Sequence, residues 1–249
     1  MSVHPTAIVE DGVQLGAGCV IHAYAVVRRG TVLGDGVAVH PFAVVGGDPN
    51  FLKFDPTTVS GVRIGAGTVI REHASINRSI YAGKDTVVGA RCYLMANAHV
   101  GHDCTVGDDV VLATNVMLGG HVDVGSHTFF GGGAGAHQFS RIGDGVMIAG
   151  LARITQDLAP FLLVAERNEV SGLNLVGLRR RGVARESIAE LKECYRDVFA
   201  GGDPRKLAAA RLAAGVRSAE AKRFLEFFAI GKRGFARPET LTLGADDSP

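Results

Sequence analysis

Two histidines three residues apart, His99 and His102, are followed directly by an acid, Asp103. An imidazole with an unperturbed pKa of about 6.5 can accept a proton at neutral pH. A carboxylate beside the ring can fix its tautomer and stabilise its protonated form. We therefore expect His102 to act as a general base and Asp103 to orient it.

Two more histidines, His121 and His137, follow at intervals that are similar to each other. A chain that returned to the same edge about every 18 residues would bring these side chains into one row with His102. The glycines at 119–120 and 131–133 would let a ligand approach the backbone closely. The row indicates a binding site along that edge, and the alternative is a set of solvated corner residues.

Three imidazoles are also a potential zinc site. The intervals from His99 to His102, from there to His121 and on to His137 contain no His-x4-His pair, so we predict no metal ion here. No Ser or Cys lies in the row as an activated nucleophile. This absence favours direct group transfer over a covalent enzyme intermediate.

The element that must position these residues is a six-residue repeat. Counted in sixes from Val9 to Val45 and from Ile64 to Ile154, 20 of 23 positions are Ile, Leu or Val. A period of six fits neither an α-helix nor a simple strand. It fits a coil with three flat sides, in which one aliphatic per side points to the axis. Stacked coils of about 18 residues form three parallel sheets, so we predict a parallel β-helix over residues 1–160.

The repeat is interrupted and later ends. Residues 46–61 are rich in turn formers and predict a loop outside the coil, and residues 79–85 are a second weak segment. After Ile154 the repeat fades. We expect a linker over residues 161–182, a helical domain over 183–232 and a disordered tail over 233–249. The helical patterns lie at 184–199, from Asp203-Pro204 onward and at 218–230.

Charge and cysteine content exclude several classes of protein. A net charge of +1 gives no overall bias toward nucleic acid or membranes. The four cysteines form no CxxC pair, no signal peptide is expected, and no apolar run of about 20 residues occurs. We expect a cytoplasmic protein with no nucleic acid partner and no stable membrane insertion. Residues 177–237 hold 15 Lys and Arg against 7 acids, which indicates either a surface for phosphates or an acidic protein, or a solvated helical surface.

Five stretches resemble the family of UDP-N-acetylglucosamine 3-O-acyltransferases, which open lipid A biosynthesis. They are residues 3–9, 98–107, 118–121, 136–139 and 177–182. The resemblance implies a left-handed parallel β-helix followed by a C-terminal helical domain. It also implies a homotrimer with its sites between subunits. The histidine motif is specific, whereas a bare hexapeptide repeat is shared by many acetyltransferases.

The resemblance implies an acyl transfer. In this reaction His102 removes the proton of the sugar 3-hydroxyl, whose oxygen attacks the thioester of a 3-hydroxyacyl chain on acyl carrier protein. Asp103 supports His102, and the backbone N–H of Gly120 stabilises the oxyanion. No cofactor is implied beyond the phosphopantetheine of the donor.

The resemblance also implies which residues bind substrate. Asn174, Arg180 and Arg181 would hold the nucleotide or the phosphopantetheine, and Gly150 would leave room for a long acyl chain. The remaining residues of the implied substrate site are His99, His121, His137, Gln138 and Lys53.

The chain departs from the family pattern at three places. Residues 50–54 lack an Asp, residues 77–80 read Asn-Arg-Ser-Ile in place of His-Arg-Gly-Thr, and residues 166–169 read Glu-Arg-Asn-Glu in place of Gln-Gly-Asn-His. The first two fall in loops near the acceptor sugar. Three alternatives stay open: transfer to the amine of a 3-amino UDP-sugar, a coenzyme A-dependent sugar acetyltransferase on the same fold, and a non-catalytic β-helix scaffold.

Overall fold

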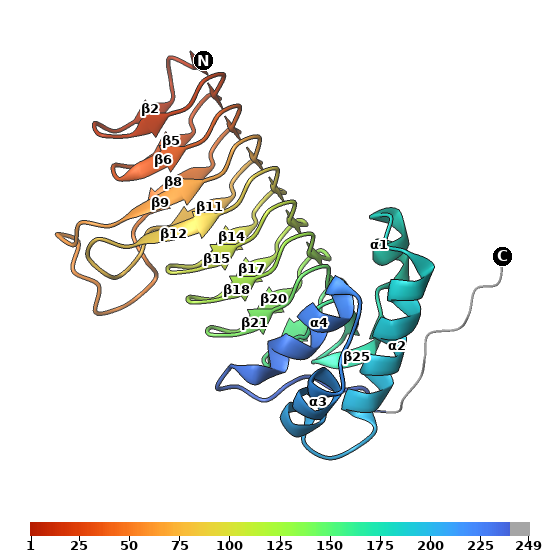
Figure 1. Ribbon diagram of the computed structural model, residues 1–249. Coiled ribbons are helices and arrows are strands. Elements are labelled where there is room, and N and C mark those ends of the chain that lie inside the picture. The colour runs from red at the N-terminus through yellow and green to blue at the C-terminus, as the bar shows by residue number, and fades with distance from the viewer. Residues whose placement is uncertain (240–249) are drawn as a thin grey trace.

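The computed structural model describes residues 1–239, and Figure 1 shows a long prism of stacked coils followed by helices. Three sheets form the sides of the prism, and neighbouring strands in each sheet come from successive coils. The strands of these coils pair in parallel, and only the last pair of the described residues, β24 with β25, is antiparallel. This is the parallel β-helix that the six-residue repeat predicts.

The strands are short and belong to the three sheets in rotation. The first sheet has the order β1 (Ser2–Val3), β4 (Val20–Ile21), β7 (Ala38–Val39), β10 (Val69–Ile70), β13 (Tyr93–Leu94), β16 (Val111–Leu112), β19 (Phe129–Phe130), β22 (Met147–Ile148), β24 (Leu162–Ala165) and β25 (Glu169–Leu173). The second has the order β2 (Ile8–Val9), β5 (Val26–Val27), β8 (Val44–Gly47), β11 (Ser75–Asn77), β14 (His99–Val100), β17 (Met117–Leu118), β20 (Gly135–Ala136) and β23 (Arg153–Ile154). The third has the order β21 (Arg141–Ile142), β18 (Asp123–Val124), β15 (Thr105–Val106), β12 (Asp85–Val88), β9 (Gly61–Ile64), β6 (Thr31–Leu33) and β3 (Gln14–Leu15).

The core of the prism is built from the repeated aliphatic positions. Val100 of β14 pairs with Leu118 of β17, which pairs with Ala136 of β20, so the register advances by three whole repeats per coil. All three side chains are buried. Burying a Val or Leu contributes about 1.5–3 kcal/mol, so each coil stabilises the coils above and below it.

The corners between the sheets require a left-handed backbone. We expect Gly and Asn there, and Asn97 and Asn115 do have φ values of 60° and 63°. However, Asp103 and His121 occupy equivalent corners with φ values of 59° and 61°. Such a conformation costs on the order of 1 kcal/mol for a residue other than glycine. Asp103 and His121, whose side chains can accept a hydrogen bond or transfer a proton, therefore lie at corners where the backbone conformation favours glycine or asparagine.

Two loops project from the prism (Figure 1), residues 48–60 between β8 and β9 and residues 78–84 between β11 and β12. Arg78 of the second loop anchors the first. Its Nε donates to Asp48 Oδ1 at 2.9 Å, and its guanidinium also donates to the carbonyl oxygens of Pro56 at 2.9 Å and of Thr58. The same group lies 4.8 Å from the centre of the Phe54 ring. The two loops therefore form one cross-linked unit at the side of the second sheet.

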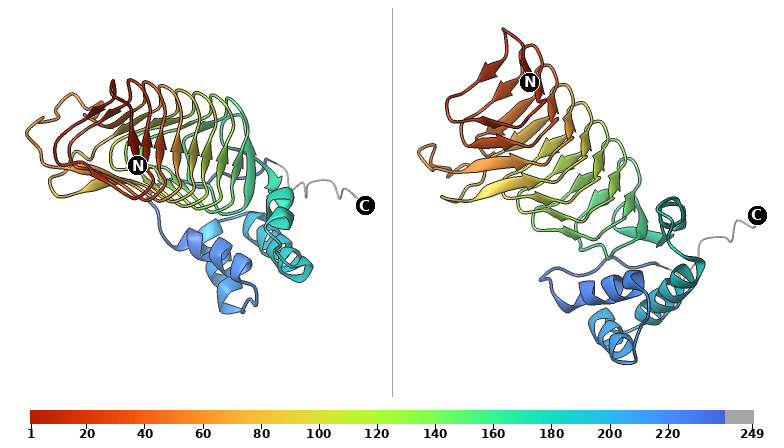
Figure 2. Two further views of the ribbon diagram at one scale, coloured as in Figure 1. Left: turned by 90° about the horizontal axis from the view of Figure 1, so that it is seen from above. Right: turned by 45° about the horizontal axis from the view of Figure 1, so that its top comes forward.

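The segment 161–182, for which we expect a linker, is built from regular secondary structure. It contains β24, β25 and the helix α1 (Leu175–Arg180), and β24 extends the first sheet by pairing with β22. The chain then forms α2 (Arg185–Phe199), α3 (Pro204–Ala213), α4 (Ala219–Glu226) and the 3-10 helix η1 (Phe227–Ala229), which gather beside the end of the prism (Figure 2). Asp203 caps α3 by accepting from the Arg205 N–H at 3.0 Å, and Pro204 is its first residue.

The segment 233–249, for which we expect disorder, lies partly outside the described residues, which end at 239. Residues 233–239 are ordered against the rest of the chain, contrary to that expectation. Phe235 is buried with its ring 4.8 Å from that of Phe228, and Arg233 donates to the carbonyl oxygen of Thr155 at 2.6 Å. No helix within residues 1–239 is long and apolar enough to cross a bilayer.

Candidate active site

A groove of about 810 Å³ runs along the second sheet, from the coil of β11 to that of β23. It is lined by five of the residues that the sequence singles out: His99, His102, Gly120, His137 and Gln138. These residues come from three successive coils. The stacking of coils therefore brings together side chains that are far apart in the chain.

His102 stands in the turn after β14, with its side chain 13% exposed. Its Nδ1 lies 2.8 Å from Asp103 Oδ2. An ionised carboxylate can only accept a hydrogen bond, so this contact assigns the proton of the neutral ring to Nδ1. The other nitrogen, Nε2, is then the basic one. We call His102 and Asp103 the dyad.

Gly120 occupies the position equivalent to His102 on the next coil, and the imidazole packs against it. A Cβ added to Gly120 would lie 2.6 Å from His102 Nε2, which is closer than a real Cβ contact. Only glycine therefore leaves room for the ring at this place. The Gly120 N–H makes no backbone hydrogen bond within residues 1–239.

Asp103 is held by three hydrogen-bond donors. Besides His102, its carboxylate accepts from the Ser79 hydroxyl and from the Ile80 N–H at 3.2 Å. Burial would raise the pKa of this acid, but the hydrogen bonds from Ser79, His102 and Ile80, together with nearby His121, lower its pKa overall. Asp103 is therefore ionised at neutral pH and fixed in position.

His121 is displaced by one residue from the row that we expect. The equivalents of His102 on the next two coils are Gly120 and Gln138, whereas His121 is equivalent to Asp103 and Phe139. Its ring stands edge-on to that of His102, with 5.0 Å between the centres, and stacks on that of Phe139 at 4.5 Å. Burial lowers the pKa of His121. The interval from His102 to His121 thus gives contact with the dyad and not superposition on it.

His99 and His137 line the groove away from this ring pair. His99 lies in β14, its Nδ1 is 2.8 Å from the Ser75 hydroxyl, and burial lowers its pKa. His137 follows β20, and its Nδ1 is 3.1 Å from a guanidinium nitrogen of Arg233. All four histidines of the row nevertheless lie in β14 or in the turns that follow β14, β17 and β20 of the second sheet.

Lys53 and Gly150 do not line the groove. Lys53 is exposed on the loop 48–60, although its neighbour Phe51 comes within 6.2 Å of the His102 ring, centre to centre. Gly150 lies in the turn after β22, and a Cβ added there would lie 3.2 Å from the carbonyl oxygen of Gly132.

Asn174, Arg180 and Arg181 lie apart from the groove. Asn174 caps α1 by accepting from the Gly177 N–H at 2.9 Å and donates to the carbonyl oxygen of Gly145 at 2.9 Å, so its side chain supports the fold. Arg180 is exposed. These three residues do not join the dyad within one chain.

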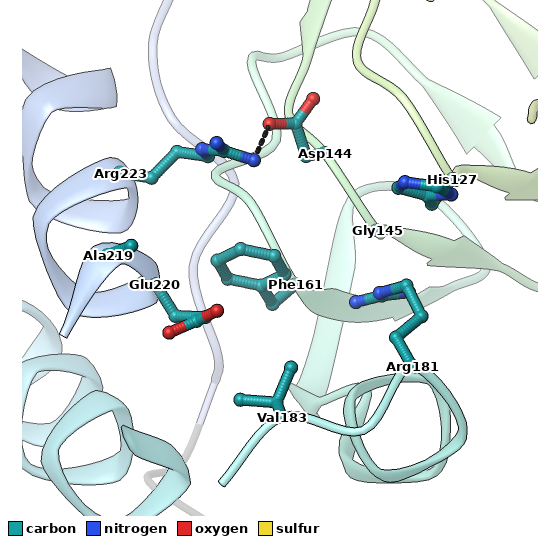
Figure 3. Close-up of a pocket in the computed structure, with 9 residues that line it drawn as sticks. All are labelled: His127, Asp144, Gly145, Phe161, Arg181, Val183, Ala219, Glu220 and Arg223. Carbon is teal, nitrogen blue, oxygen red and sulfur yellow. Dashed lines mark hydrogen bonds and ion pairs between the residues drawn. The ribbon is translucent and has the colours of Figure 1, made fainter. Parts of the chain in front are cut away.

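Figure 3 shows Arg181 in a separate pocket of about 260 Å³, between the prism and α4. Phe161 and Glu220 line the same pocket, and Arg223 is paired there with Asp144 at 2.9 Å. The Nη2 of Arg181 is buried and has no hydrogen-bond partner within residues 1–239. Burial lowers the pKa of this guanidinium.

Several residues at the site were not singled out as site residues from the sequence, among them Ser79 and Asn77. Ser79 is buried beneath Asp103, and Asn77 lines the groove with its Nδ2 donating to the Asp48 carbonyl oxygen at 2.9 Å. The Oδ1 of Asn77 has no partner within the described chain. The signal for both was the departure from the family pattern at residues 77–80.

Two family models match the chain. One, described as UDP N-acetylglucosamine O-acyltransferase, domain 2, matches residues 157–236. The other, described as bacterial transferase hexapeptide (six repeats), matches residues 12–47 and 85–120. The two models together cover both the prism and the C-terminal helices.

Relatives match over most of the chain. The acyl-[acyl-carrier-protein]–UDP-N-acetylglucosamine O-acyltransferase of Anaeromyxobacter sp. (strain K) is 36% identical over 95% of this chain and 100% of its own length. The protein of the same name from Campylobacter jejuni subsp. doylei is 40% identical over 93% of this chain and 95% of its own length. Shorter matches cover 48% of the relative from Anaeromyxobacter sp. (strain Fw109-5), at 43% identity over 49% of this chain, and 60% of that from Burkholderia lata, at 35% identity over 61% of this chain.

Solved structures agree with the fold. The UDP-N-acetylglucosamine O-acyltransferase of Moraxella catarrhalis has a TM-score of 0.87 and 31% identity, over 95% of this chain and 100% of that one. The UDP-N-acetylglucosamine acyltransferase of Campylobacter jejuni has a TM-score of 0.83 and 34% identity, over 95% of this chain and 99% of that one. The predicted left-handed β-helix with a helical C-terminal domain is confirmed. The chain belongs to the acyl-[acyl-carrier-protein]–UDP-N-acetylglucosamine O-acyltransferase family and is a transferase enzyme.

Proposed function

We propose that this chain transfers a 3-hydroxyacyl group from acyl carrier protein to the 3-hydroxyl of UDP-N-acetylglucosamine, the first step of lipid A biosynthesis. The names of its relatives state the donor and the acceptor. The observation that supports this reaction best is the dyad, whose Nδ1 proton is held by Asp103 while Nε2 lies against Gly120 in the groove.

The proposed reaction is a direct transfer. His102 Nε2 takes the proton of the 3-hydroxyl while its oxygen forms a bond to the thioester carbonyl carbon. The Gly120 N–H donates to the oxyanion of the resulting tetrahedral intermediate, a kind of contact worth about 2.7–4 kcal/mol in other enzymes. The intermediate collapses, the C–S bond breaks, and His102 returns the proton to the phosphopantetheine sulfur. The reaction needs no redox cofactor or metal ion, because proton transfer and acyl exchange account for every bond.

The proposed active form is a homotrimer. Asn174, Arg180 and Arg181 lie away from the groove of their own chain, so they contact its substrates only if another copy supplies them. Large apolar side chains are exposed in the single chain, among them Met117, which lines the groove, at 56% and Leu151 at 78%. An interface between copies would cover such side chains. The cytoplasmic location expected from the sequence stays a prediction.

The test is to offer purified protein 3-hydroxyacyl-carrier protein with UDP-N-acetylglucosamine and to identify the product by mass spectrometry. We expect one 3-hydroxyacyl group on the sugar nucleotide. The parallel reactions contain a 3-amino UDP-sugar as acceptor, or acetyl-coenzyme A as donor. A faster reaction with either would favour the corresponding alternative, and no product in any reaction would favour a non-catalytic scaffold.

A further inference from the structure

His102, Asp103 and His121 bring three groups that can ligate a metal to one corner of the prism. One nitrogen from each ring and one carboxylate oxygen all lie within 4.8 Å of one another. His102 Nδ1 is 2.8 Å and His121 Nε2 is 3.9 Å from the same oxygen, Asp103 Oδ2. Within residues 1–239, no other group of three His, Cys, Asp or Glu side chains has its ligand atoms this close together.

These separations fit a tetrahedral ion. With metal–ligand bonds of about 2.0–2.2 Å, neighbouring ligands of a zinc ion lie roughly 3.4 Å apart. The observed separations lie on both sides of that value, so small rotations of the two imidazoles would complete the set. Asp103 need not move, because Ser79 and Ile80 already hold its carboxylate.

The ligand types select the metal. Two imidazoles and one carboxylate suit Zn²⁺, Co²⁺ and Ni²⁺, whereas Mg²⁺ and Ca²⁺ prefer oxygen ligands alone. Three protein ligands leave a fourth position for water or for a substrate group. The three side chains are 13%, 9% and 19% exposed, so an ion in solvent can reach them.

Metal binding would change the tautomer of His102. A neutral imidazole carries a single proton, which the contact with Asp103 assigns to Nδ1. An ion bound to Nδ1 forces that proton onto Nε2. The nitrogen that would accept the proton of the substrate hydroxyl is then no longer a base.

We propose that this corner is an inhibitory zinc site, in which one Zn²⁺ per chain binds His102, Asp103 and His121 and withdraws His102 from acid–base catalysis. Zinc binding stands on the geometry alone. Inhibition rests on the proposed function. Zinc binding and inhibition are therefore measured separately. The sequence predicts no metal ion here, and at this corner we now propose a zinc ion that binds reversibly.

The binding experiment is calorimetric titration of the full-length protein with ZnCl₂, alongside visible absorption with CoCl₂. We expect one ion per chain and the intense visible bands of tetrahedral Co²⁺. His121→Gln and Asp103→Asn should each weaken zinc binding about 100-fold or more, since even partners that only orient a ligand contribute 10–100-fold. The control is His127→Gln, because His127 pairs with one acid, Asp109, at 3.7 Å and these two belong to no group of three metal-ligating side chains within residues 1–239.

MgCl₂ should give no binding heat. The proposal would be overturned if the wild-type protein showed no saturable zinc binding, or if all four proteins bound zinc with equal affinity.

Acyl transfer is then measured with increasing Zn²⁺, and we expect inhibition at the concentrations that fill the site, reversed by EDTA. The residual activity of His121→Gln should require about 100-fold more zinc for the same inhibition. Zinc bound at the site without inhibition would also overturn the proposal. Absence of acyl transfer in zinc-free protein would count against the proposed function alone, because the titrations would still decide zinc binding.

Discussion

The basicity of His102 depends on which ring nitrogen carries the proton, and one short network controls this. Asp103 accepts from His102 Nδ1, Ser79 Oγ and Ile80 N–H, and its own N–H donates to the Thr86 hydroxyl at 2.8 Å. Ser79 does not line the groove, and its hydroxyl also accepts from the Tyr81 N–H at 3.0 Å, so its expected effect on the reaction is through Asp103. It is a positioning residue in the proposed reaction.

Replacing Ser79 by Ala should lower kcat about tenfold, equivalent to about 1.4 kcal/mol of activation free energy, while KM changes little. The reason is that Asp103 loses a donor and holds the His102 ring less firmly. The control is Ser140→Ala, because the Ser140 hydroxyl is also buried but has no hydrogen-bond partner within the described residues. Equal kcat losses in the two variants would show that burial of a hydroxyl, and not support of Asp103, is responsible.

The effect of Ser79→Ala on the free energy of unfolding should depend on pH. The folded pKa of Asp103 lies below its ordinary value of 3.8. Its carboxylate therefore stabilises the fold above that pH and loses this contribution as the pH falls through the folded value. Ser79→Ala should lower the free energy of unfolding by about 1–3 kcal/mol near pH 7, and the difference should shrink below pH 4. Urea titrations at both pH values check this.

At the scale of residues, the dyad was predictable because His102 and Asp103 are adjacent in the sequence. Ser79 was not, because its contact with Asp103 depends on how the loop 78–84 folds back across a coil. His121 was misplaced because the residue one full coil after His102 is Gly120, and His121 comes one position later. Because of this offset of one residue, the His121 ring contacts the His102 ring edge-on and does not lie directly above it.

At the scale of elements, the loop 48–60 forms one wall of the site. Phe51 approaches His102, Asn50 lines the groove, and Arg78 ties this loop to the neighbouring loop 78–84. The Arg78 side chain is only 10% exposed. A guanidinium that spans three acceptors and a ring cannot be replaced by an aliphatic side chain of similar size.

Arg78→Leu should therefore free the loop. We expect faster amide hydrogen exchange over residues 48–60 and a KM for the sugar nucleotide raised about tenfold. Chemistry at His102 is retained, so kcat should fall less. Arg91→Leu is the matched control, because Arg91 is 59% exposed and its ion-pair partners among the described residues are Asp108 and Asp109. Unchanged exchange in the Arg78 variant would show that the loop is held by other contacts.

The repeat predicted the strands because each side of a coil needs one buried aliphatic. The loop 78–84, which the sequence marks only as a weak segment at 79–85, leaves the count in sixes undisturbed. Ile64 pairs with Val88, so the additional chain between these two strands is one whole six-residue repeat. After Ile154 the count in sixes no longer predicts the strands, because the chain between paired strands is not a whole number of repeats. Ile148 pairs with Val164, whereas the count places its partner at Glu166, so β24 continues the first sheet out of phase with the repeat.

At the scale of the whole molecule, each site of the proposed trimer combines residues of two chains. His102→Ala and Arg180→Ala proteins should each be nearly inactive. Random mixing of the two in one trimer leaves about one quarter of the interfaces with an intact His102 facing an intact Arg180. Co-expression should therefore restore about a quarter of wild-type activity per trimer. If each site were built from one chain, the mixture would stay inactive, because no chain carries both residues.

The central claim is that His102 is the base. Its most direct measurement is kcat for acyl transfer by His102→Ala beside the control His4→Ala, which removes an exposed histidine after β1, at the other end of the prism. We predict that kcat falls by about 10²–10⁴-fold in the first protein and stays near the wild-type value in the second, with the circular dichroism spectrum unchanged in both. A His102→Ala protein that turns over at the wild-type rate would contradict the account.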